Sequence, residues 1–213
     1  MPPVDRFVPR FVAEPPQELL PYGRWAVTLR EHFLGACERL DGEGEDLGQP
    51  ESVVWFPDRT WAGRTYVPAT ARTTTGFELF GHVSFTPAPE GGQPSGFDAT
   101  ADFTNETAEA NPGWKLDLCD EVVGWWRGEE GKMAEMTLVW GVPLVARGAI
   151  VTAELADLAV DQCALVEDRF TLLAPDNYRS DTLDVKLFDA KGTELARESL
   201  YEDDDEGPDD DEG

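Results

Sequence analysis

The sequence predicts a mainly β protein, an antiparallel sandwich or barrel of about ten short strands with one amphipathic helix near the N-terminus. Three observations lead to this prediction. Apolar and polar residues alternate with a period of two over most of the chain that follows residue 50. Turn sequences rich in Gly, Pro, Asn and Asp separate these runs. The connections are too short for the crossover helices that parallel strands require.

Residues 21–40 are the one segment with helical periodicity. Their apolar side chains recur at steps of three and four residues, which is typical of a helix with one buried stripe. Pro21 suits the first helical turn, and Gly42 suits the position after the end. We therefore expect a helix that lies with its apolar stripe on the core.

The segments that follow have the length and alternation of strands. They cover residues 52–56, 64–73, 76–86, 97–104, 114–126, 133–142, 149–155, 158–166, 170–174, 183–189 and 194–201. No linker interrupts residues 17–201, so we expect a single β-rich domain there.

The two ends of the chain differ from this domain in composition. Residues 1–16 contain five prolines, which predicts an extended arm rather than a helix. Residues 202–213 contain nine acidic residues and no basic ones, which predicts a disordered acidic tail.

The charge of the chain restricts its partners. There are 43 acidic against 17 basic residues, a net charge of −26, and residues 1–201 alone carry 34 acidic residues against the same 17 basic ones. Such a surface repels nucleic-acid phosphates and anionic membranes, so we expect neither direct nucleic-acid binding nor membrane binding. A basic protein surface or peptide is the partner that this charge attracts.

Motifs of several enzyme classes are missing from the sequence, among them a phosphate-binding P-loop, a dinucleotide-binding glycine fingerprint, a zinc-protease helix and paired cysteines. We therefore expect no cofactor and no metal, and a protein that is not an enzyme. The three cysteines are expected to be reduced. We find no signal segment or membrane span, so the expected location is the cytoplasm.

Two adjacent tryptophans and a nearby carboxylate form the first candidate ligand site. Neighbours in a strand point to opposite faces, so Trp125 and Trp126 put an aromatic ring on each face. In a regular strand Asp120 shares an apolar face with Trp126, where a carboxylate must be paired, protonated or close to a ligand. The basic residues that could pair with Asp120 are Arg72, Arg127 and Arg147. Trp140, on the next predicted strand, is a further lining candidate.

Histidine and further carboxylates supply the second set of candidates. His82 lies on the polar, exposed side of its predicted strand, with Glu78 four positions away on the same face. Such a pair could exchange protons near neutral pH. Asp117, Asp120 and Glu121 could supply paired carboxylates.

Three functions are compatible with these observations. The first, which charge and missing motifs favour, is an acidic adaptor or accessory protein that binds a basic protein partner. The second is a β-barrel or sandwich that binds a small molecule, including the case of an enzyme that uses Asp120 or His82. The third is an inhibitor whose carboxylates imitate the phosphates of a nucleic acid.

Overall fold

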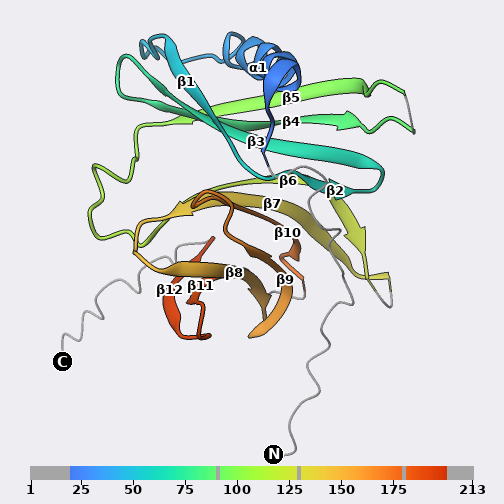
Figure 1. The fold of residues 1–213 in the computed structure, drawn as a ribbon, viewed down its shortest axis with the longest axis vertical. Helices are drawn as coiled ribbons and strands as arrows, with labels where there is room; N and C mark the ends of the chain where they lie inside the picture. Colours follow the sequence, from blue (N-terminus) through green and yellow to red (C-terminus); the bar gives the residue numbers. More distant parts are fainter. Residues whose placement is uncertain (1–19, 90–91, 129–130, 179–180, 201–213) are drawn as a thin grey trace, which may run out of the picture.

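The computed structural model describes residues 20–89, 92–128, 131–178 and 181–200. The predicted arm and the predicted acidic tail lie outside these ranges. The described residues form one helix and twelve strands in three antiparallel sheets, which confirms the mainly β prediction. The sheets are stacked, and the helix covers the outer face of the first sheet (Figure 1).

The first sheet and the helix account for the N-terminal half of the chain. The sheet has the order β1 (Pro50–Trp55), β3 (Arg64–Thr73), β4 (Glu78–Thr86) and β5 (Ser95–Thr104), and β2 (Arg59–Trp61) pairs with β3. The helix α1 (Gly23–Cys37) buries Leu29 and Phe33 against it. Trp25 reaches the same interface, where its ring meets that of Phe85 edge-on at 4.9 Å.

The helix is shorter than the predicted 21–40. Tyr22 precedes it with an extended backbone at φ −143° and ψ 165°. At the other end the amides of Arg39 and Leu40 bond to carbonyls three residues earlier, at 3.0 and 3.1 Å. The last predicted turn is thus the tighter turn that commonly ends a helix.

The two remaining sheets come from the C-terminal half. The central sheet has the order β10 (Phe170–Asp176), β7 (Met133–Pro143) and β6 (Leu116–Arg127). The third sheet has the order β12 (Glu194–Ser199), β11 (Leu183–Asp189), β8 (Gly148–Leu155) and β9 (Leu158–Ala164). All three sheets stay open at their edges within the described residues, so a barrel is not closed.

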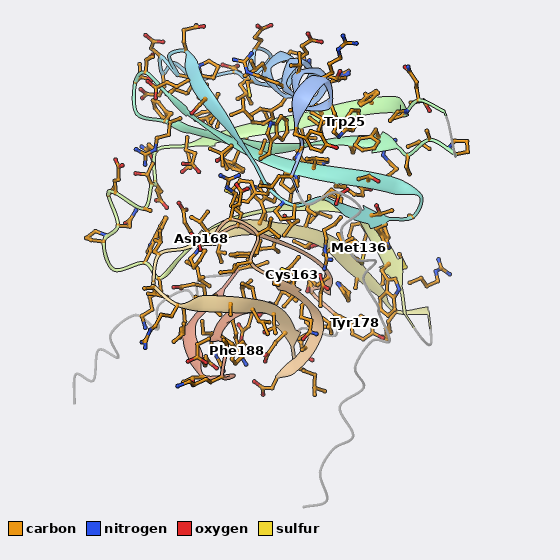
Figure 2. The ribbon with its side chains drawn as sticks, in the orientation of Figure 1. Trp25, Met136, Cys163, Asp168, Tyr178 and Phe188 are labelled. Atoms are coloured by element: carbon orange, nitrogen blue, oxygen red, sulfur yellow. The ribbon has the colours of Figure 1, made fainter. Side chains whose placement is uncertain are left out.

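The central sheet has an apolar core on each face. Toward the first sheet it buries Met136, Leu138 and Trp140, which pack with Phe56 and Tyr66. Toward the third sheet its buried side chains are Val139, Phe170, Leu172 and Ala174. Figure 2 shows side chains filling the space on both sides of this sheet. Alternate residues of one strand therefore enter two different cores.

The first sheet is likewise covered on both faces where aromatic neighbours occur. Trp55 packs in the core beneath the helix, and the next residue, Phe56, packs in the core against the central sheet. Both side chains are buried. The expected placement of adjacent aromatic residues on opposite faces is confirmed for this pair.

A buried ion pair connects the first and third sheets. Arg59 on β2 contacts the carboxylate of Asp161 on β9, and both side chains are no more than 5 % exposed. The same carboxylate accepts the amide of Leu173 on β10 at 2.8 Å and that of Gln162 at 2.8 Å. One side chain therefore joins strands from all three layers.

We expect Asp161→Ala to destabilise the fold by about 3 kcal/mol, because it removes the carboxylate that neutralises a buried guanidinium. Urea unfolding at pH 7 measures this change. The double variant R59M/D161L should recover much of the loss, since neither member of this pair is then left as a charge without the other.

The control is the half-exposed pair of Arg197 and Asp184, whose side chains are 47 % and 31 % exposed. Asp184→Ala should cost less than about 1 kcal/mol. Equal losses in Asp161→Ala and Asp184→Ala would contradict a special role for the buried pair.

Candidate ligand-binding cleft

The first and central sheets separate beside β6, and a cleft opens there. Near β7 and β10 the space between these sheets is filled by aromatic and aliphatic side chains. Toward β6, polar residues replace them on the facing surfaces. Glu78 and His82 come from β4, and Asp117 and Glu121 come from β6. The period of two in each strand places these four side chains on the inner side of their sheets.

Two connected hollows of about 330 Å³ each share Glu78, Asp117 and Cys119 as lining residues. One extends toward β1 and β3 and contains a base, Arg72. The other extends toward β5 and the segment before β6. Its acidic lining residues are Glu78, Asp102, Glu106, Asp117 and Asp120, and its lining includes no base.

The two carboxyl groups shared by these hollows repel each other. Burial raises the pKa of Glu78 above its ordinary 4.5, and the charge of Asp117 raises it further, against the effect of Arg72. Burial also raises the pKa of Asp117 above its ordinary 3.8, again opposed by Arg72. Arg72 itself is half-exposed and pairs at 2.8 Å with Glu109. The cleft therefore holds negative charge that its own residues neutralise only in part.

Cys119 lies between these carboxyl groups and is the least reactive kind of thiol. Burial raises its pKa well above the ordinary value, and the charges of Glu78, Asp117 and Asp120 raise it further. The thiolate is the nucleophilic form of cysteine. At neutral pH this side chain therefore serves as a protonated lining residue.

His82 is buried, which corrects the expectation of an exposed strand residue. Its side chain is 6 % exposed, and its partner is Glu121 of β6 rather than Glu78. His82 Nδ1 lies 2.8 Å from Glu121 Oε2 and 3.1 Å from Thr100 Oγ1, and the Thr100 hydroxyl donates to the same carboxylate at 2.8 Å. The histidine thus joins the two sheets at the inner end of the cleft.

This network does not have the geometry of a nucleophile with its base. The hydroxyl and the carboxylate both meet the same ring nitrogen, Nδ1. In a catalytic triad the histidine uses one nitrogen for the carboxylate and the other for the nucleophile. The described geometry instead supports a structural link between the sheets.

Asp120 and Trp126 are not related by regular alternation, because β6 contains a β-bulge between them. The pairing of β6 with β7 shifts between Val122 and Gly124, so residues beyond the bulge change face. A Cβ at Gly124 would collide with the Trp61 ring, so any larger residue there would require that ring to move.

The environment of Asp120 also differs from the expected arginine pair. Asp120 is an exposed residue. Partial burial of its carboxyl group raises its pKa, and the charges of Asp176 and Glu121 raise it further. None of the ion pairs found within the described residues joins it to an arginine.

The three candidate tryptophans occupy separate places. Trp140 is fully buried in the core between the first and central sheets. Trp126 packs on Tyr178 with a ring separation of 5.9 Å. Trp125 is 60 % exposed. None of the three lines the hollows described above.

The acidic residues of β5 and the following segment are the part of the cleft that the sequence did not single out. Asp102 and Glu106 carry no motif. The only signal is the alternation of residues 97–104, which places Asp102 on the side opposite Phe103.

A separate hollow of about 310 Å³ lies under the helix. Its lining includes Trp25, Phe85 and several prolines, and Asp58 is its one ionisable lining residue. It has the character of an apolar interface rather than of a charged site.

Other searches of the described residues add no further site. No group of three or more His, Cys, Asp or Glu side chains there is arranged to hold a metal ion. The helix in the same part of the chain is too short and too polar to cross a membrane. Comparisons with protein-family models, curated proteins and solved structures give no match to this chain.

We expect Glu78→Gln and Asp117→Asn to stabilise the protein at pH 7. A carboxyl group whose folded pKa is raised holds its proton more tightly in the folded state, so its contribution to stability falls as pH rises above the ordinary value. The gain should therefore be largest at pH 7 and vanish as pH falls below 4.5 and 3.8, respectively. Urea midpoints measured across this range test the prediction.

Asp189 serves as a control, because its substitution should change stability at pH 7 in the opposite direction. Amides of Lys191 and Thr193 donate to its carboxylate at 2.8 and 2.9 Å, and these bonds lower its pKa. Asp189→Asn should therefore lower the urea midpoint at pH 7, with the difference disappearing as pH falls through the lowered pKa. A lower midpoint for Glu78→Gln or Asp117→Asn at pH 7 would contradict the proposed repulsion.

Proposed function

We propose that this protein is a non-enzymatic binding or accessory protein that recognises a basic segment of a protein partner. The observation that carries the proposal is the hollow toward β5, with five acidic lining residues and no basic one. A lysine or arginine side chain entering it would bring a positive charge next to Glu78 and Asp117, whose pKa values are raised chiefly by burial.

Two further observations support a basic ligand over an anionic or a neutral one. The net charge of −26 steers cations toward the molecule over long distances. The hollow also has aromatic and aliphatic walls, since Phe80, Trp114 and Leu118 line it. These walls suit the methylene chains of lysine and arginine and allow a guanidinium to stack on a ring.

The same hollow would accept a small organic cation, which is the form of the small-molecule alternative that the geometry favours. Its size is at the lower end of the range for small-molecule sites. The open end toward the protein surface favours a ligand that is part of a longer chain, because Asp102 and Glu106 are exposed.

The test compares two triple variants that change the net charge equally. D102N/E106Q/D117N removes three of the five acidic charges that line the hollow. D157N/E167Q/D168N removes three exposed charges elsewhere, one in the β8–β9 turn and two in the connection from β9 to β10. Binding of a fluorescent nona-arginine peptide is measured by anisotropy at low and physiological salt. We expect the cleft variant to bind about 10-fold more weakly and the control variant less than about 2-fold, because close charge pairs contribute more than distant ones.

Equal weakening in both variants would show that only overall charge matters and would remove the cleft from the proposal. Absence of salt-dependent binding in the unmodified protein would contradict the proposed function itself. Circular dichroism of each variant confirms that the fold is retained.

A further inference from the structure

The edge of the central sheet beside the cleft is an open strand. Among the described strands, β6 pairs with β7 alone. It is twelve residues long, which is long for an edge strand. Its other edge lies next to the acidic hollow, whose lining includes Leu118, Cys119 and Asp120 of this strand. An additional strand at this edge would therefore run along the cleft.

The hydrogen-bond pattern identifies the backbone groups that point to this edge. The amide of Leu144 donates to the carbonyl of Lys115 at 2.8 Å, so Lys115 directs its backbone toward β7. The register is continuous from Leu116 to Val122. Backbone direction alternates along a strand, so Leu118, Asp120 and Val122 direct their N–H and C=O groups away from β7.

The side chains on the two faces of β6 indicate which kind of strand would fit beside it. Asp117 and Glu121 point toward the first sheet, where Asp102 and Glu106 add further negative charge. The other face of β6 carries Leu118, which packs against the core, Val122, which is 44 % exposed, and the exposed Asp120 between them. A neighbouring strand would thus place alternate residues against the carboxylates of the cleft and the others against a face with two apolar residues and one carboxylate.

We propose that β6 binds its basic partner by strand addition: an extended segment with alternating basic and apolar residues pairs with the free edge of β6. This inference rests on the proposed function and adds the mode of recognition. Backbone hydrogen bonds supply affinity in such complexes, and pockets for alternate side chains supply specificity. Trp125, 60 % exposed beyond the bulge, offers an aromatic surface at the far end of the same strand.

Two alternatives for the edge fit less well. Acidic residues on an edge strand can prevent pairing between copies of the same chain. At −26 per chain that protection is strong, and it turns into attraction when the approaching strand is basic. The neighbouring edge strand β5 is partly occupied, because Arg64 and Arg39 donate to its Gly96 and Ala99 carbonyls at 3.1 and 3.5 Å.

The experiment uses the full chain and a fluorescent dodecapeptide of alternating arginine and valine. Two isomers carry backbone N-methyl groups, one on every valine and the other on every arginine. Each isomer blocks one edge of the extended peptide. We expect one isomer to bind like the parent and the other to lose about 10-fold or more, because each lost backbone hydrogen bond weakens binding severalfold.

Sequence order provides a second readout. A peptide of six arginines followed by six valines has the same charge and composition as the alternating one. It should bind about 5-fold or more weakly, because its charges cannot all face the cleft.

Protein variants complete the design. Asp120→Ala removes one carboxylate and keeps the edge amide, whereas Asp120→Pro also removes the amide that points to the open edge. We expect Asp120→Pro to bind the alternating peptide about 5-fold more weakly than Asp120→Ala does. If the proline variant does not fold, the comparison of the methylated isomers still decides the question.

Equal binding of the two methylated isomers would overturn strand addition. If the D102N/E106Q/D117N variant still bound the peptides more weakly in that case, the proposed function would stand without strand addition. If no peptide bound in a salt-dependent way, both the proposed function and strand addition would be contradicted. A dimer that dissociates in Asp120→Pro would assign the edge to a second copy of the chain and would also overturn the proposal.

Discussion

The arrangement of the whole molecule depends on the need of one three-stranded sheet to bury both of its faces. β10 is buried at all seven positions, and β7 is buried from Met136 to Gly141 without a break. Alternate side chains in these strands point in opposite directions, so a single partner layer would leave half of them in water. The first and third sheets are the two surfaces that cover them.

Covering a sheet on both sides requires that polar groups between the layers be paired. Asp161 satisfies this by binding Arg59 and two backbone amides. Glu121 satisfies it by binding His82 and Thr100. Both arrangements bring together residues that are distant in the chain, and both hold the first sheet to the layers below it. The buried polar groups therefore specify how the layers align, while the apolar cores supply most of the stabilising free energy.

The sequence predicts the strands well and their assembly less well, for physical reasons that particular residues illustrate. Alternation located eleven strands because each half-buried or doubly covered strand selects residues with a period of two. β2, with three residues, is too short to show a period, and its buried Arg59 and Thr60 resemble a polar loop. The stacking of three open sheets instead of a closed barrel depends on which edges meet, and alternation contains no information on that.

The candidate site was predictable only in part. The sequence pairs His82 with Glu78 on the same strand, but its partner Glu121 lies 39 residues away and on another sheet. The face that Asp120 and Trp126 are expected to share rests on regular alternation, which the extra residue between Val122 and Gly124 interrupts. The acidity of the cleft arises from β4, β5 and β6 together. No single segment of sequence shows it.

The same charge bears on the edge of β6 that no other described strand covers. An uncovered edge exposes backbone donors and acceptors to any extended chain, and natural proteins usually shorten, bend or charge such an edge. β6 keeps its length, carries acidic side chains on both faces, and is bent by a bulge only beyond Val122. Two copies of a chain with a net charge of −26 repel each other at every approach, and the acids of β6 repel most strongly along the edge itself. The charge that opposes self-association would also attract the basic partner proposed above.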